Sequence, residues 1–322
     1  MYDRILFPTD GSEAATAALE YAAAVADAEE ATVHLLTVAD TAGEGVGHLG
    51  GEATDTLERE AESVVADAAE RVGEAREGDR PVVTAVRRGS PAEEVVAYAD
   101  EADVDLVVMP TQGRRGIERV LLGSVTERVV NTAPVPVLVV PPVDDPAGFA
   151  YPPGDVLVPT DGSRGAERAL AEGVDLALAS GARLHVRHVV ETASLGPDAR
   201  SLLREAALDE RGEDLVDAAT ERAAAAGVGD VRGSVAYGSP YRELLSYVDE
   251  GDVDLVALGT GGRTEFGRFL PGGVTAKLLR TCPVPLLVIR APEGDEGDEE
   301  GNGNGNGSES EDERRADEEA TG

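Results

Sequence analysis

The feature that most constrains this 322-residue chain is an internal repeat. Four segments recur in the same order and at nearly the same spacing: 5–12 and 156–163, 89–91 and 238–240, 103–107 and 252–256, and 134–136 and 283–285. A repeat of this length indicates two copies of one fold, and the chain is long enough for two domains. We therefore expect one domain over residues 1–141 and a second over residues 155–291.

Each copy alternates short apolar runs with stretches of helical periodicity, which predicts an α/β fold with a parallel sheet. Ser12 and Ser163 are placed to cap the first helix of each copy. By analogy, each sheet should be doubly wound with five strands in the flavodoxin-like order 3-2-1-4-5. In the first copy the expected strands are residues 4–8, 32–38, 82–87, 105–109 and 135–140.

Three segments lack the pattern of a packed element. Residues 142–154 are rich in proline and predict a linker. Residues 292–322 are acidic, with repeated Gly-Asn and no large apolar side chain, and predict a disordered tail. The glycine-rich stretch 42–52 predicts a mobile loop, with a lid over a ligand as the alternative.

The net charge of the chain is −35, from 63 acidic and 28 basic residues, and every basic residue except Lys277 is an arginine. This bias is typical of proteins kept soluble at high salt and predicts a halophile, with an acidic mesophilic protein as the alternative. It argues against nucleic acid and anionic membranes as partners. No leader or long apolar stretch is visible, so we expect a cytoplasmic protein. A single cysteine, Cys282, is expected to be a packed, inert thiol.

The predicted topology places a ligand crevice at the carboxyl ends of the first and fourth strands, where the winding direction reverses. The first strand ends at Asp10 in one copy and at Asp161 in the other. The fourth strand runs into a glycine-containing loop, and further glycines at 123 and 272–273 open a helix. Because glycine loops and helix starts present backbone N–H groups, this pattern favours a nucleotide.

This loop pattern resembles the GxxG-x9-G(S/T) signature of the ATP-binding branch of the universal stress protein family, over residues 1–140 and 155–290. The resemblance implies an adenine nucleotide-binding regulatory protein of the stress response, with ATP or AMP as ligand and Mg²⁺ as its companion ion. The aspartate would contact the nucleoside, the valine the adenine, and the glycine loop the ribose and phosphates. The implied residues are Asp10, Val38, Gly113, Gly123 and Ser124 in the first copy and Asp161, Val189, Gly259, Gly262 and Gly272 in the second.

Each copy departs from the family signature at one position. Pro110 stands where the first glycine belongs, and Gly273 replaces the serine or threonine. Either change removes one hydrogen bond to a charged group, which weakens a site about ten- to a hundredfold without abolishing it. The two copies therefore need not be equivalent. Arg114, Arg115 and Arg263 are placed either to contact phosphates or to serve as solvated surface charges.

Sequence motifs leave catalysis open but favour a protein that is not an enzyme. No P-loop lysine follows a GxxxxG pattern, and no dinucleotide fingerprint follows a first strand. The paired His34 and His185 fit satisfied sheet histidines better than metal ligands. Three hypotheses remain: a nucleotide-binding regulator, a nucleotide-free scaffold, and a weak ATPase. The family resemblance further implies that the last strands pair within the chain, and the chains in turn could form a homodimer.

Overall fold

The computed structural model describes residues 1–42, 51–76, 80–112, 122–142, 149–192, 208–251, 253–260 and 273–291. The predicted tail and most of the predicted loop at 42–52 lie outside these residues. The first half contains β1 (Arg4–Pro8), α1 (Glu13–Ala28), β2 (Thr32–Asp40), α2 (Gly51–Ala75), β3 (Val82–Gly89), α3 (Pro91–Glu101), β4 (Leu106–Pro110), α4 (Ser124–Thr132) and β5 (Val137–Val140). The second contains β6 (Asp155–Pro159), α5 (Arg164–Ser180), β7 (Arg183–Glu191), α7 (Leu208–Ala226), β8 (Val231–Gly238), α8 (Pro240–Glu250), β9 (Leu255–Thr260), α9 (Val274–Thr281) and β10 (Leu286–Arg290).

The strands form a sheet in the order β3-β2-β1-β4-β5-β10-β9-β6-β7-β8. Within each half this is the predicted order 3-2-1-4-5, and every pairing there is parallel. The two five-stranded sheets are continuous, because β5 and β10 pair antiparallel with Leu287 opposite Leu138. The expected pairing of the last strands is thus present within one chain.

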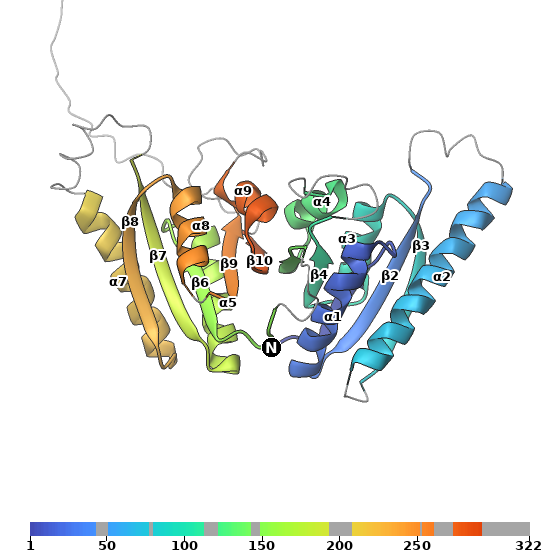
Figure 1. Ribbon diagram of the computed structural model, residues 1–322, viewed down its shortest axis with the longest axis horizontal. Helices are drawn as coiled ribbons and strands as arrows, with labels where there is room; N and C mark the ends of the chain where they lie inside the picture. Colours follow the sequence, from blue (N-terminus) through green and yellow to red (C-terminus); the bar gives the residue numbers. More distant parts are fainter. Residues whose placement is uncertain are drawn as a thin grey trace, which may run out of the picture. The chain divides into compact units, whose positions relative to one another are not determined.

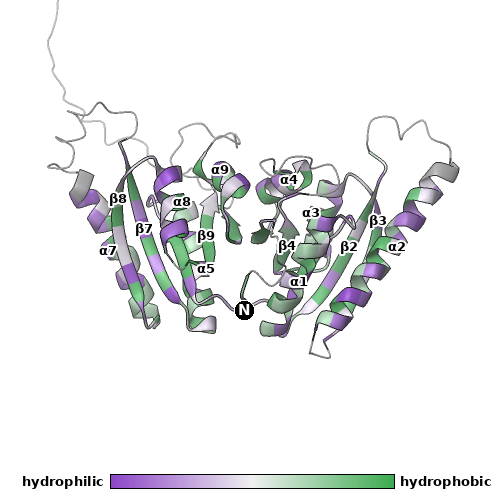
Figure 2. Cartoon of the chain, viewed as in Figure 1, coloured by the Kyte–Doolittle hydropathy of each residue, from purple (hydrophilic) through white to green (hydrophobic). Residues whose placement is uncertain are grey.

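The helices cover both faces of the sheet (Figure 1). Buried side chains of α1, α2, α5 and α7 form one hydrophobic cluster with the sheet, and those of α3, α4, α8 and α9 form the other. Alternate residues of a strand serve opposite faces, as Ile5 and Leu6 do. In Figure 2, β4 and β9 are green over most of their length, whereas α2 and α7 alternate purple and green. The sheet is therefore a buried layer built mainly of aliphatic side chains.

Part of the predicted linker packs against the core of the sheet. Residues 149–154 contain no helix or strand, but the rings of Phe149 and Tyr151 both lie 6.0 Å from the ring of Tyr21 in edge-to-face contacts. The hydroxyl of Tyr151 donates to Glu29 at the end of α1, 2.8 Å away. This stretch therefore adds aromatic packing to a core that is mainly aliphatic.

Candidate functional site

The predicted crevice lies where the first and fourth strands of each half part. β1 pairs with β4 through two residue pairs only, Ile5 with Leu106 and Leu6 with Val107. β6 and β9 likewise share two residue pairs. Past these pairs the loop after β1 leads to α1 on one face, and the segment after β4 leads to α4 on the other. Such a topological switch point is the usual ligand position in this architecture.

Pro110 lies at this split, which explains how a proline is tolerated in a buried strand. The next residue, Thr111, donates its N–H to Val140 of β5 at 3.0 Å. Because successive N–H groups of a strand point to opposite edges, the nitrogen of Pro110 faces β1. β1 and β4 no longer pair at that level, so the proline costs no ladder hydrogen bond.

Asp10 and Asp161 each close a tight turn after the first strand. Oδ1 of Asp10 accepts the N–H of Ser12 at 3.0 Å, and Oδ1 of Asp161 accepts that of Ser163 at 2.9 Å. Between each pair stands a glycine with positive φ, 72° at Gly11, a conformation that other residues rarely adopt. The turn thus holds both carboxylates, partly exposed, at the carboxyl end of the first strand.

The serines of this motif act as helix caps, as predicted. Ser12 Oγ accepts the N–H of Ala15 at 3.2 Å, and Ser163 Oγ accepts that of Ala166 at the same distance. The recurring Thr-Asp-Gly-Ser segment therefore has a structural role as a turn and helix cap. Its recurrence alone is no sign of a ligand.

Val38 and Val189 occupy matching positions near the ends of β2 and β7. Both are partly buried and pack against the cluster formed with α3, α4, α8 and α9. They stand beside the first strand, because β1 pairs with β2 and β6 with β7. An apolar surface of this kind suits the face of a base ring.

Gly123 and Ser124 form the start of α4. Gly123 is the N-cap and donates its own N–H to the carbonyl of Thr111 at 2.7 Å. Thr126, in the first turn, donates its hydroxyl to the carbonyl of Pro110 at 2.9 Å. These two bonds hold the helix start against the end of β4. The N–H groups of Ser124, Val125 and Thr126 have no partner within the helix, and the side chain of Ser124 is exposed.

Gly259 has a packing role in the second half. A Cβ atom at this position would lie 2.1 Å from the carbonyl carbon of Gly165, in the first turn of α5. A Cβ at Gly165 would in turn lie 2.4 Å from the carbonyl oxygen of Thr260. The two glycines let the end of β9 and the start of α5 touch backbone to backbone.

The other predicted loop residues lie outside the described residues: Gly113, Gly262, Gly272, Arg114, Arg115 and Arg263. In the second half, α9 has Gly273 as its N-cap, and a Cβ there would meet nothing within 4 Å.

The paired histidines are satisfied sheet residues, each bonded to a tyrosine that sequence analysis missed. His34 Nδ1 lies 2.9 Å from the hydroxyl of Tyr98, and His185 Nδ1 lies 2.7 Å from that of Tyr247. His185 Nε2 also bonds Oδ1 of Asp155 at 2.7 Å. A carboxylate only accepts, so Nε2 carries a proton. The tyrosines lie more than 60 positions away in sequence, but their repetition in both copies was a usable signal.

The environments of His34 and Cys282 favour the uncharged form of both side chains. Burial, and secondly the charge of Arg4, lowers the pKa of His34 below its ordinary 6.5 and favours the neutral ring. Burial raises the pKa of the Cys282 thiol to about 11. The thiol therefore stays protonated at neutral pH, in agreement with the prediction of a packed, inert cysteine.

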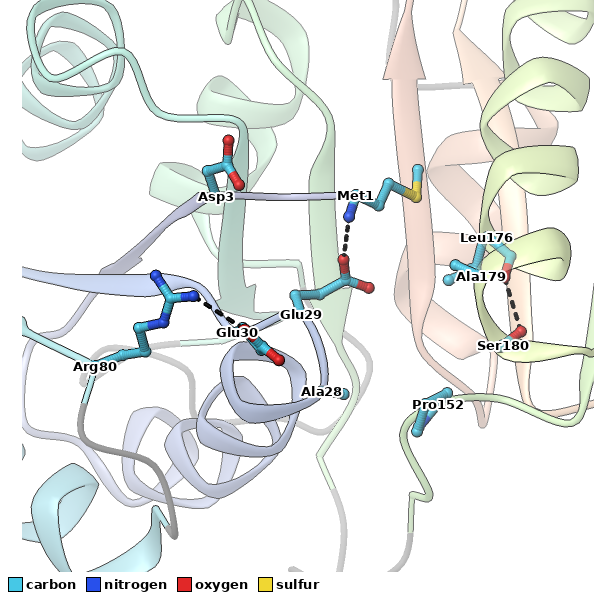
Figure 3. A pocket seen from close by; sticks show the side chains of 10 residues that line it. All are labelled: Met1, Asp3, Ala28, Glu29, Glu30, Arg80, Pro152, Leu176, Ala179 and Ser180. Carbon is cyan, nitrogen blue, oxygen red and sulfur yellow. Dashed lines mark hydrogen bonds and ion pairs between the residues drawn. The ribbon is translucent and has the colours of Figure 1, made fainter.

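A cavity of about 360 Å³ lies at the opposite end of the sheet from the crevice (Figure 3). It is lined by the ends of α1 and α5, including Glu29, Glu30 and Ser180. Burial alone would raise the pKa of Glu29, but hydrogen bonds from the amino group of Met1 and from Tyr151 hold it below its ordinary value. Glu29 is therefore held by an ion pair with the amino group of Met1 and by a hydrogen bond from Tyr151.

Comparison with known proteins decides the family. The model of the universal stress protein family matches residues 1–141 and again 154–290. The chain belongs to this family. Universal stress protein MJ0531 of Methanocaldococcus jannaschii is 37% identical over 146 residues, which are 44% of this chain and 82% of that protein. Universal stress protein MJ0577 of the same organism is 31% identical over 157 residues, 44% of this chain and 95% of its own length. Each relative thus corresponds to one half.

The tandem arrangement has a solved counterpart. A universal stress protein from Archaeoglobus fulgidus aligns with 89% of this chain and 98% of its own, with a TM-score of 0.65 and 23% identity. At that identity the likeness concerns the fold. Within the described residues, no helix is long and apolar enough to cross a membrane, and no cluster of three or more acidic, histidine or cysteine side chains could hold a metal.

Proposed function

We propose that this universal stress protein binds an adenine nucleotide, ATP or AMP, in the crevice of its first half and acts as a regulatory protein of the cytoplasmic stress response. The observation that carries the proposal is the pairing of two features across the split between β1 and β4. Asp10 ends one side of the split, and the start of α4 is held at the end of the other.

The residues of the first half fit a nucleotide from base to phosphate. Val38 offers an apolar surface beside Asp10, whose carboxylate suits the hydroxyl groups of a ribose. At α4, three N–H groups and the exposed hydroxyl of Ser124 suit a phosphate, with the helix dipole in support. The N–H of Gly123 donates to the carbonyl of Thr111, so Gly123 shapes the turn and does not donate to the phosphate. Mg²⁺ would accompany ATP through the phosphates.

The second half offers a weaker version of the same site. Asp161 and Val189 repeat the base and ribose side of the first half. On the phosphate side, Gly273 at the start of α9 has no hydroxyl, and Gly259 is occupied in packing against α5. We therefore assign the tighter site to the first half.

Two other functions compete with nucleotide binding. A nucleotide-free scaffold is favoured by the antiparallel pairing of β5 and β10, which joins the halves through their backbones. A weak ATPase would use the same crevice, and it predicts phosphate release that disappears when Asp10 and Asp161 are both replaced by alanine. Lack of turnover in the wild-type chain would eliminate the ATPase.

The proposal is tested by mass spectrometry of nucleotide released from the full chain purified at high salt, followed by calorimetric titration with ATP and AMP. Asp10→Asn keeps an acceptor for the N–H of Ser12 but removes the charge, whereas Asp10→Ala removes both. We expect Asp10→Ala to weaken binding at least tenfold, and Asp161→Ala to weaken it less. A wild-type chain that carries no nucleotide and shows no binding at millimolar concentration would favour the scaffold.

A further inference from the structure

Helix α4, whose start forms the proposed phosphate site, is held at its other end by the second half of the chain. Arg290, the last residue of β10, donates from a guanidinium nitrogen to the carbonyl oxygen of Asn131 at 3.2 Å. Arg280 of α9 lies 3.9 Å from the carboxylate of Glu127, in the first turn of α4. Both groups of this pair are about 30% exposed, so the bond from Arg290 is the stronger link.

The bond from Arg290 to Asn131 places a positive charge at the C-terminus of α4. This carbonyl is one of the last four of α4, which have no partner within the helix. A positive charge near a helix C-terminus also interacts favourably with the helix dipole. The last turn of α4 has no basic residue of its own, whereas α9 has Arg280. The second half thus supplies the cation that the last turn of α4 lacks.

Among the residues that the structure describes, these two contacts run from the second half to the first and have no reverse counterpart. In the repeat, Glu127 corresponds to Ala276 and Arg290 corresponds to Pro141. Neither counterpart has a charged side chain, so the first half cannot make the same two contacts to α9. The two copies have therefore diverged at their junction as well as in their loops.

A movement of the second half would reach the phosphate site through a short, rigid path. α4 has nine residues, about 14 Å of helix, and its start is bonded to β4 through Thr126 and Gly123. Its end is bonded to β10, which pairs with β5. The orientation of the N–H groups of the first turn of α4 therefore depends on where β10 holds the helix.

We propose that the second half acts as a positioning partner for the nucleotide site of the first, with Arg290 as the main positioning residue and Arg280 as its auxiliary. This inference rests on the proposed function. Nucleotide affinity in the first half is then regulated by whatever alters the second half, and the junction is the element that couples them. Thermodynamic linkage requires the reverse effect as well, so nucleotide must stabilise the β5 to β10 junction.

The first experiment measures ATP affinity by calorimetry in full chains in which Asp161→Ala weakens the second crevice. The double variant Arg290→Met, Arg280→Met is expected to bind ATP about fivefold or more weakly, the lower end of typical coupling between sites. The matched control is Arg128→Met, which removes a cation from α4 whose partner, Glu93, lies 2.6 Å away in the first half. It should change affinity less than twofold.

A second measurement covers the case in which the double variant does not fold. Hydrogen exchange of the Asp161→Ala chain is followed with and without ATP, and we expect ATP to slow the amides of β10 and α9. Equal affinity in the variant and its background, or unchanged exchange at β10 under saturating ATP, would overturn the inference and leave the proposed function intact. Failure of the wild-type chain to bind ATP would instead remove the proposed function.

Discussion

The first helix of each half packs on the same strands but at different depths. In the second half, α5 carries Gly165 and Gly173 against the sheet, and a Cβ at Gly173 would lie 2.6 Å from a methyl carbon of Val158. The matching residues of α1 are Ala14 and Ala22. Glycine thus brings α5 closer to β9 than alanine permits for α1 and β4. Duplication has kept the topology while the distance between layers has changed.

The polar groups under α3 and α8 differ in a similar way. Each half keeps a histidine bonded to a tyrosine. The first strands of the two halves, β1 and β6, begin at equivalent positions with opposite charges, Arg4 in one half and Asp155 in the other. The carboxylate bonds His185, whereas the cation opposes protonation of His34. A shared framework therefore tolerates opposite charges at one position, because each is matched locally.

The largest effect on stability is expected where the end of β9 touches the start of α5. Gly259→Ala places a methyl group 2.1 Å from the backbone of Gly165, which cannot move without shifting α5. We expect the free energy of unfolding to fall by about 2–4 kcal/mol, measured by denaturant titration. Gly229→Ala is the matched control, because a Cβ there meets nothing within 4 Å. A loss below about 1 kcal/mol for Gly259→Ala would show that α5 can move away from β9 at little cost in free energy.

A smaller loss is expected at the position where the halves carry opposite charges. Asp155 accepts hydrogen bonds from His185 and from Arg183, the latter at 2.9 Å. Asp155→Ala leaves the mostly buried His185 without one partner and should cost about 1–3 kcal/mol. Arg4→Ala should cost less than about 1 kcal/mol, because Arg4 is exposed. Equal losses by chemical denaturation would contradict the contrast between the halves.

The fold was largely predictable because its signals are local or repeated. Alternating apolar runs give the strands, and the recurrence of whole segments fixes the equivalence of the halves. The serine caps followed from the same pattern, whereas the pairing of the last strands was implied by the family resemblance. The strand order came from analogy, since no single strand identifies its neighbour.

The surroundings of the candidate site were less predictable. The tyrosine partners of the histidines, the contact between Gly165 and Gly259, and the bond from Arg290 to Asn131 all join distant positions. A single sequence contains no signal for such pairs except their repetition. The close approach at Gly165 could not be predicted either, because a glycine in the first turn of a helix indicates nothing until the neighbouring strand is known.

Pro110 provides a third comparison, because Gly259 is its counterpart. The nitrogen of Pro110 faces the split between β1 and β4, so Pro110→Gly gains no ladder bond. We expect a loss of about 1 kcal/mol from the greater entropy of the unfolded chain. The restored N–H would face the proposed nucleotide site, so calorimetry should show ATP affinity raised about tenfold. A change of less than threefold would instead mean that the N–H missing at Pro110 is not a ligand contact.

The smallest effect concerns pH and the first half. The folded pKa of His34 lies below its ordinary 6.5 because burial, and then Arg4, favour the neutral ring. Between those two pKa values the unfolded chain binds more protons, so the contribution of His34 is present above pH 6.5 and is lost as pH falls toward the folded pKa. His34→Gln should therefore flatten the decline in stability below pH 6.5, measured by denaturant titration at several pH values. An unchanged slope would show that His34 takes up its proton as easily in the folded chain as in the unfolded one. The cation at Arg4 would then not distinguish the first half from the second.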